Sequence, residues 1–149
     1  MERMAKDDWF MGFALQASKR SHDAETQVGA VLMHRETHAI LATGFNGFVR
    51  GAKDEQLPNT RPDKYPYMVH AEQNLIAHCA RHGISMDNCY VYCTHSPCSI
   101  CMRLLWQCGI TRIVVKELYR DFDQIKSMKD LKINVSKAGD YYVLEYSND

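Results

Sequence analysis

Two short motifs hold the side chains of this sequence that are best suited to metal chemistry. His70 and Glu72 stand in H-A-E, and Cys98 and Cys101 stand in S-P-C-S-I-C. The two cysteines are three positions apart, so on a helix they share one face, and Pro97 suits the first turn of that helix. A helix N-terminus favours negative charge and helps thiols to ionise. With His70, they make three ligands for zinc, and the fourth position stays open to water as in catalytic zinc sites.

Glu72 lies two residues beyond His70, where a carboxylate can act beside the metal without binding it. Such a group can take a proton from water and give it first to an amidine-like substrate and then to departing ammonia. H-x-E followed by P-C-x-x-C is the sequence pattern of zinc deaminases. C-x-x-C alone is also common in structural zinc sites and redox sites, and His95 or Cys93 could close a structural site. The two motifs in this order favour catalytic zinc.

Composition limits the classes of function. The chain has 149 residues, which is most simply one domain spanning 1–149. Lys and Arg number 18 and Asp and Glu number 18, so no basic excess indicates nucleic acid, and a small-molecule substrate is favoured. The clustered cysteines favour a reducing compartment, with four of them expected as small buried hydrophobes: Cys79, Cys89, Cys93 and Cys108. Without an apolar leader or membrane span, we expect a soluble protein of the cytoplasm (the host cytoplasm for a viral protein).

The hydrophobic pattern predicts alternating helices and strands. Helices are expected from Trp9 to near Ser21 and at 71–82, 98–108 and 121–131, and strands at 28–33, 38–45, 89–94 and 112–115. Segments 133–135 and 141–146 are read as edge strands or a fifth strand. Gly29 inside the first strand suggests close approach by another group, such as the substrate. The irregular stretch 48–66 reads as a lid or binding loop, or as disorder.

Several polar residues are candidates for substrate contact, each with a structural alternative. Arg20 either complements a helix C-terminus or contacts a substrate phosphate, and Tyr119, just past a strand end, is a second phosphate candidate. Asn46 stands in an N-G turn, but its side chain also suits a sugar hydroxyl. Tyr65 or Tyr67 could flank a bound base, or pack beneath the loop.

The chain resembles deoxycytidylate (dCMP) deaminases of the cytidine deaminase-like superfamily from about Trp9 to Arg120. The shared motifs are K-R-S at 19–21, Q-V-G-A at 27–30, G-F-N-G at 44–47, K-Y-P-Y at 64–67, H-A-E-Q-N at 70–74 and P-C-S-I-C at 97–101. The zinc motifs mark the superfamily. G-F-N-G together with K-Y-P-Y-x-x-H-A-E is similar to the dCMP branch in particular.

The resemblance implies an α/β fold with three layers, α/β/α, around a mixed five-stranded sheet. It implies hydrolysis of dCMP to dUMP and ammonia, which supplies a precursor of dTMP. The zinc ligands would be His70, Cys98 and Cys101, with Glu72 as the proton shuttle. In substrate binding, Asn46 would hold the deoxyribose hydroxyl and the Ala71 backbone would help to fix the pyrimidine edge.

The resemblance also implies regulation. Members of the family are commonly homohexamers that dCTP activates and dTTP inhibits, with Mg²⁺ accompanying a triphosphate effector. The implied effector segment is Gly44, Phe45, Asn46 and Gly47. The family usually has tyrosine where Phe45 stands.

Three other functions share parts of the pattern. Deaminases of tRNA adenosine or polynucleotide cytidine carry the same zinc motifs, but the neutral charge and the lack of an aromatic stripe count against them. A deaminase of the free nucleoside would act on deoxycytidine, so comparing activity on dCMP with activity on deoxycytidine distinguishes it from a dCMP deaminase. A binding module with purely structural zinc is the third.

Overall fold

The computed structural model describes residues 1–118 and 131–147 of the chain. Within this part three α-helices accompany eight strands and two short 3₁₀ turns. The helices are α1 (Lys6–Ser18), α2 (Ala71–His82) and α3 (Ser99–Gln107). The strands are β1 (Gly29–His34), β2 (Ile40–Phe45), β3 (Gly47–Phe48), β4 (Met68–Val69), β5 (Cys89–His95), β6 (Arg112–Glu117), β7 (Ile133–Ala138) and β8 (Tyr141–Tyr146).

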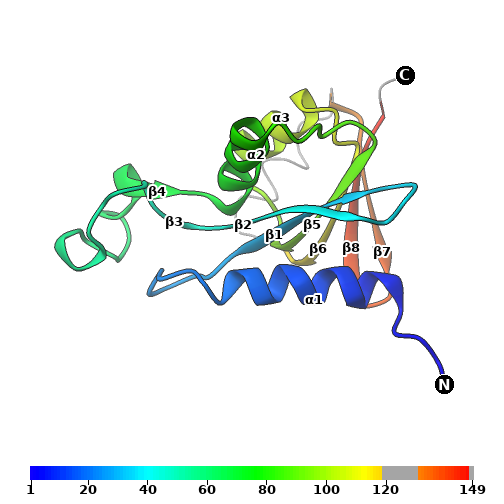
Figure 1. Cartoon of the computed structure of the whole chain (residues 1–149), viewed down its shortest axis with the longest axis horizontal. Helices are drawn as coiled ribbons and strands as arrows, with labels where there is room; N and C mark the ends of the chain where they lie inside the picture. Colours follow the sequence, from blue (N-terminus) through cyan, green and yellow to red (C-terminus); the bar gives the residue numbers. More distant parts are fainter. Residues whose placement is uncertain (119–130, 148–149) are drawn as a thin grey trace.

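The main sheet of the described part is mixed and has six strands in the order β2-β1-β5-β6-β8-β7. Only β5 and β6 run parallel among these pairs, and α3 connects them as a crossover helix, because parallel neighbours need a connection that returns along the sheet. The other neighbouring pairs are antiparallel. A separate hairpin, β3 with β4, extends away from the sheet beyond β2 (Figure 1).

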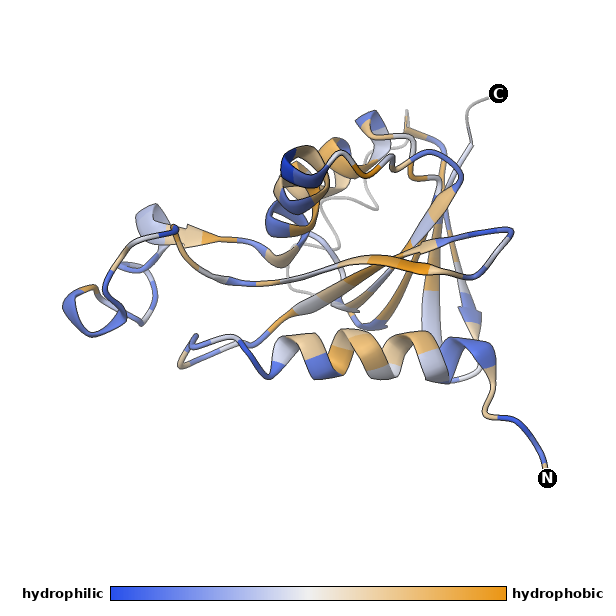
Figure 2. Cartoon of the chain, viewed as in Figure 1, coloured by the Kyte–Doolittle hydropathy of each residue, from blue (hydrophilic) through white to orange (hydrophobic). Residues whose placement is uncertain are grey.

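Helices cover both faces of the sheet, with α1 on one side and α2 and α3 on the other (Figure 1). Alternate residues of each strand serve the two faces, as the pleat requires. In β1, Ala30 and Leu32 join the core with α2 and α3, whereas Val31 and Met33 join the core with α1. Figure 2 shows the apolar residues concentrated on the central strands. The predicted three-layer α/β/α arrangement is confirmed.

Two glycines let the helices approach the sheet closely. A Cβ atom on Gly29 would lie 1.9 Å from the Ala14 carbonyl oxygen of α1. A Cβ atom on Gly44 would lie 2.5 Å from the Ala71 carbonyl oxygen and 2.8 Å from the Leu75 nitrogen of α2. The close neighbour that the sequence predicted at Gly29 is therefore a helix backbone.

Within the described residues, the predicted elements agree with the observed ones except at the sheet's far edge and in the short β3–β4 hairpin. The helix predicted at 71–82 has those bounds, and the strands predicted at 28–33, 38–45, 89–94 and 112–115 all form. The prediction of five strands is wrong, because β7 and β8 both join the sheet. Most of the helix predicted at 121–131 lies outside the described residues. No helix of the described ranges is both long and apolar enough to cross a membrane.

Candidate active site

The N-terminus of α2 carries the first motif. His70 occupies the N-cap position with extended backbone dihedrals, φ −72° and ψ 156°, and Glu72 stands in the first turn. The side chain of Gln73 accepts a hydrogen bond of 2.9 Å from the His70 backbone N–H, as in a capping box. This contact fixes the turn from which the His70 ring and the Glu72 carboxylate project.

The N-terminus of α3 carries the second motif. Cys98 is the N-cap residue, and its Sγ accepts a 3.5 Å hydrogen bond from the Cys101 backbone N–H. The helix begins directly after β5, so the thiols lie beyond the carboxyl end of that strand, where ligands gather in α/β sheets. The prediction that the cysteine pair opens a helix is confirmed.

The two helix N-termini meet, and His70, Cys98 and Cys101 form a cluster that could hold a metal ion. Their ligand atoms all lie within 4.8 Å of one another. The His70 Nδ1 atom is 3.6 Å from Cys98 Sγ and 3.3 Å from Cys101 Sγ. One imidazole and two thiols are a donor set that zinc prefers, and three ligands leave one tetrahedral position for water.

The electrostatics of the cluster favour a thiolate. A hydrogen bond from Cys101, together with those from His70, lowers the pKa of the Cys98 thiol to about 4, although burial opposes the shift. The hydrogen bond with Cys98 in turn raises the pKa of His70. A thiol that ionises this readily is ready to bind a cation, so the residues present fit zinc.

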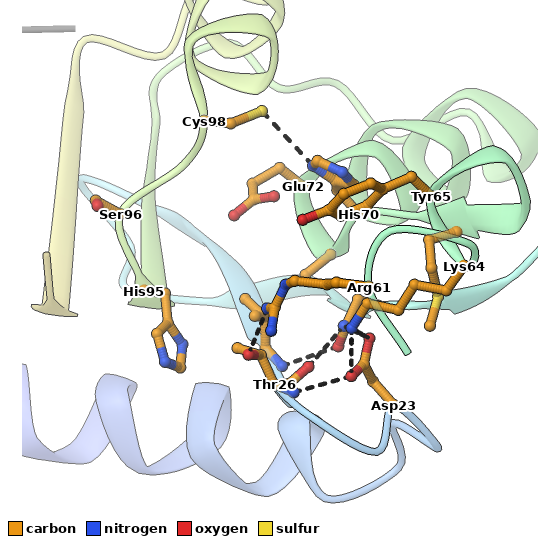
Figure 3. Close-up of a pocket in the computed structure, with 14 residues that line it drawn as sticks. Asp23, Thr26, Arg61, Lys64, Tyr65, His70, Glu72, His95, Ser96 and Cys98 are labelled. Atoms are coloured by element: carbon orange, nitrogen blue, oxygen red, sulfur yellow. Dashed lines mark hydrogen bonds and ion pairs between the residues drawn. The ribbon is translucent and has the colours of Figure 1, made fainter. Parts of the chain in front are cut away.

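Glu72 lies beside the cluster with 4 % of its surface exposed. Its Oε1 atom accepts a 3.0 Å hydrogen bond from the Cys93 thiol of β5. In Figure 3 the Glu72 carboxylate lies next to the His70 ring and near Cys98, within the pocket that these residues line. A carboxylate so placed can exchange protons with a molecule bound at the metal.

These groups occupy one end of an open pocket that encloses about 570 Å³, part of which is continuous with solvent. The pocket is bounded by the loop after α1, the end of β2, the segment before α2 and the segment between β5 and α3. Its lining residues are Asp23, Thr26, Val28, Asn46, Arg61, Lys64, Tyr65, Met68, His70, Ala71, Glu72, His95, Ser96 and Cys98.

A buried ion pair forms the wall opposite the cluster (Figure 3). Lys64 Nζ lies 2.8 Å from both carboxylate oxygens of Asp23 and 3.1 Å from Glu25, and both Lys64 and Asp23 expose only 3 % of their side chains. Burial would raise the pKa of Asp23, but hydrogen bonds from Lys64 and from the backbone N–H groups of Thr26 and Glu25 lower it overall. The Asp23 carboxylate therefore stays ionised although its side chain is buried.

Arg61 joins the same wall. Its Nη2 atom donates a 2.8 Å hydrogen bond to the Thr26 hydroxyl, and its Nη1 atom is 3.5 Å from the Glu25 carboxylate. With Lys64, it brings two cations to the pocket wall, where the carboxylates of Asp23 and Glu25 balance their charge. The planar guanidinium of Arg61 is the group of this wall that best matches a negatively charged part of a ligand.

Three of the predicted substrate contacts, Asn46, Ala71 and Tyr65, line the pocket. The Asn46 side chain is also part of the wall itself, because its Oδ1 accepts from the Val28 N–H at 2.9 Å and its Nδ2 donates to the Thr26 carbonyl at 2.9 Å. Asn46 thus has a structural role and also lines the pocket, but the predicted N-G turn is wrong, because residues 46–47 lead directly from β2 into β3.

The other predicted contacts lie elsewhere. Arg20 is exposed just after α1 and Tyr67 is 39 % exposed, and neither is among the lining residues, whereas Tyr65 is. Tyr119 lies outside the described residues. In the predicted effector segment, Gly44 is buried against α2 and the Phe45 carbonyl accepts a 2.7 Å hydrogen bond from Asn74.

Sequence analysis did not identify several lining residues, notably Asp23, Thr26, Arg61 and Ser96. Lys64 had been noted only as part of K-Y-P-Y. These residues sit in loops without periodicity, and Lys64 is 41 positions from its partner Asp23. The only signal in the sequence was an excess of charged residues at 53–64, which is equally typical of an exposed loop.

A three-layer α/β/α fold, with a His/Cys/Cys cluster and a buried glutamate where two helices begin, defines a zinc-dependent deaminase. The family model for the cytidine and deoxycytidylate deaminase zinc-binding region matches residues 4–117. The chain belongs to this family, and zinc is its cofactor.

Individual relatives agree with the family. The deoxycytidylate deaminase of Pongo abelii is 34 % identical over 124 residues, which are 78 % of this chain and 68 % of that protein. The deoxycytidylate deaminase of Mycobacterium phage D29 is 32 % identical over 127 residues, 76 % of this chain and 96 % of that one. The crystal structure of dCMP deaminase from cyanophage S-TIM5 in complex with dCMP and dUMP superimposes with a TM-score of 0.73 and 28 % identity, covering 93 % of this chain and all of that one.

Proposed function

We propose that this protein hydrolyses dCMP to dUMP and ammonia, in the supply of pyrimidine deoxynucleotides. The observation that carries the proposal is the cluster of His70, Cys98 and Cys101 with Glu72 beside it, at one end of a pocket whose other wall holds two cations. The relatives named above that act on dCMP support this substrate.

The reaction replaces the 4-amino group of the cytosine ring by oxygen from water. Zinc, when bound by the three ligands, supplies a nucleophile at neutral pH because it lowers the pKa of water. Glu72 accepts the proton that water loses and delivers it to the ring nitrogen N3 as the new C4–O bond forms. Glu72 then transfers the proton of the new C4 hydroxyl to the amino group, so that the C4 carbonyl forms, the C4–N bond breaks and ammonia leaves.

The pocket walls are proposed to hold the rest of the substrate. The Ala71 backbone fixes the pyrimidine edge, and Asn46 presents its amide to the deoxyribose hydroxyl. We assign the 5′-phosphate to Arg61, because a guanidinium matches phosphate geometry and this one lies in the pocket wall. Lys64 is a weaker candidate, since its three N–H donors face three carboxylate oxygens.

The earlier phosphate and base contacts remain testable predictions. Arg20 and Tyr67 would have to reach the substrate from outside the described pocket, and Tyr119 awaits direct measurement. Variants of Arg20 and Arg61 separate the two arginine assignments.

Further predictions come from the sequence composition and from the family resemblance. They are a single deaminase domain over residues 1–149, a homohexamer, a cytoplasmic location, and control by dCTP and dTTP with Mg²⁺ at the segment Gly44, Phe45, Asn46 and Gly47. Titration of activity with each triphosphate, with and without Mg²⁺, tests the control, and light scattering tests the oligomer.

The experiment that tests the function is ammonia release from dCMP, deoxycytidine, CMP and a cytosine-containing oligonucleotide, each measured with zinc-loaded protein. We expect turnover with dCMP far above the others. Glu72→Gln should keep one zinc per chain and lose a factor on the order of 10²–10⁴ in kcat, the usual contribution of general acid–base catalysis. Turnover confined to deoxycytidine would favour the nucleoside enzyme, and full activity of Glu72→Gln would refute the proposed chemistry.

A further inference from the structure

Cys93 is a buried thiol that the proposed reaction does not use, and it touches the one carboxylate that the reaction does use. It lies in β5 with 0 % of its surface exposed, and its Sγ donates a 3.0 Å hydrogen bond to Glu72 Oε1. Its neighbours in the same core, Val91 and Leu75, are apolar. A free cysteine among apolar side chains is usually a small hydrophobe, so a contact with a carboxylate needs a reason.

The pleat of β5 explains how the thiol reaches Glu72. Val91 and Cys93 point to the face covered by α2 and α3, whereas Tyr92 between them points to α1. Cys93 therefore stands beneath the first turn of α2, which carries Glu72. A side chain at this position of the strand meets the buried side of the carboxylate and leaves its other side to the pocket.

We propose that Cys93 is a positioning residue, whose thiol holds Glu72 Oε1 so that the carboxylate keeps its orientation toward the substrate in each proton transfer. The proposal rests on the function proposed above. Glu72 has three side-chain torsions, and proton transfer needs its oxygen within hydrogen-bond reach of the group that gains or loses the proton. A partner on one oxygen restricts these torsions while the second oxygen remains available.

Cys93 is suited to this task because it keeps its proton. Burial raises the pKa of this thiol well above its ordinary value, and the neighbouring Glu72 charge acts in the same direction. Cys101 also forms a hydrogen bond with Glu72, but it belongs to the metal cluster, and zinc binds cysteine as thiolate, which has no proton to donate. With zinc bound, the Cys93 thiol of β5 therefore still donates its hydrogen bond to Glu72.

The test compares two substitutions at Cys93. Cys93→Val keeps the size and the apolar packing but removes the donor, and Cys93→Ser keeps a donor in nearly the same place. We expect Cys93→Val to lower kcat about 10- to 100-fold, the usual effect of removing an outer partner of a catalytic metal site, with KM for dCMP within about twofold of wild type. Cys93→Ser should recover most of this loss.

Controls separate positioning from general damage to the core. Cys79→Ala alters another buried cysteine, on the inner face of α2, and should leave kcat unchanged. The zinc content and the urea concentration at the midpoint of unfolding are measured for every variant. Equal losses in Cys93→Val and Cys93→Ser, or a kcat of Cys93→Val equal to wild type, would overturn the proposal.

A readout independent of turnover is the infrared S–H stretching band of Cys93, identified by its absence from Cys93→Val. We expect this band to move to higher frequency in Glu72→Ala, because the acceptor is gone. An unmoved band means that the thiol does not donate to Glu72 in solution. If wild type is inactive on dCMP, the function fails, whereas the infrared comparison still decides whether Cys93 holds Glu72.

Discussion

Replacing Lys64 by methionine should destabilise the protein by about 3 kcal/mol. Lys64 exposes only 3 % of its side chain, and its ammonium group contacts both carboxylate oxygens of Asp23 at 2.8 Å. Removing one partner of a buried ion pair typically costs about 3–5 kcal/mol, because the other charge stays in the interior. We take the lower value, since Asp23 keeps hydrogen bonds from the N–H groups of Glu25 and Thr26 at 2.7 and 2.8 Å.

The assay is urea unfolding of zinc-saturated protein followed by circular dichroism, with zinc held constant because a bound metal adds to stability. At roughly 2–4 °C per kcal/mol for a chain of this size, the melting temperature should fall by about 6–12 °C. The double variant Asp23→Asn/Lys64→Met should be more stable than Lys64→Met, since no unpaired charge remains. A loss below about 1 kcal/mol for Lys64→Met would refute the reasoning.

Acid provides an independent check on the same pair. The folded pKa of Asp23 lies below the ordinary value of 3.8. A carboxyl with a lowered folded pKa contributes its full stability above the unfolded pKa and loses it as the pH falls through the folded one. The difference in the free energy of unfolding between wild type and Lys64→Met should therefore be constant near neutral pH and shrink below about pH 4.

Three further predictions concern the packing, the phosphate and the metal. Gly44→Ala should destabilise by about 1–3 kcal/mol in urea unfolding because its Cβ meets α2 backbone, whereas Gly12→Ala, with nothing within 4 Å, should stabilise α1 by about 0.5–1 kcal/mol. Arg61→Ala should raise KM for dCMP about tenfold or more without changing KM for deoxycytidine, because only dCMP carries the phosphate. If Arg20→Ala gives this result and Arg61→Ala does not, Arg20 binds the phosphate. A chelator should abolish ammonia release and Zn²⁺, not Mg²⁺, should restore it; activity that survives complete zinc removal contradicts the catalytic role.

The cluster of three metal-ligand residues could be predicted from the sequence because its members must converge on one ion. Once His70, Cys98 and Cys101 are read as ligands, chemistry places α2 and α3 with their N-termini together. Nothing similar links Lys64 to Asp23, whose contact joins two loops without periodicity. The wall that contains Lys64, Asp23 and Arg61 therefore could not be predicted from the sequence, whereas Arg20, as a cation at the end of a predicted helix, could be proposed for the phosphate.

The sequence predicted β7 as too short, and the sheet as one strand too few, for a related reason. Two-sided burial gives β1 and β5 apolar runs, but β7 is an edge strand in which exposed polar residues alternate with half-buried ones. Its only strongly hydrophobic residues are Ile133 and Val135, so the sequence predicted only a short strand at 133–135. An element with one weakly buried face leaves little hydrophobic signal, and its partner β8 supplies the pairing that the pattern cannot show.

The position of the site follows from how the two helices are attached to the sheet. α3 is fixed by the parallel crossover from β5 to β6, which sets Cys98 at the end of β5. α2 is not part of this crossover, and the absence of a side chain at Gly44 lets its first turn approach β2. Any residue larger than glycine there would push His70 and Glu72 away from the cysteines. Gly44→Ala should thus weaken zinc binding and lower kcat as well as stability, whereas Gly12→Ala should leave zinc binding and kcat unchanged. A dialysis measurement of zinc affinity distinguishes this effect from a loss of fold alone.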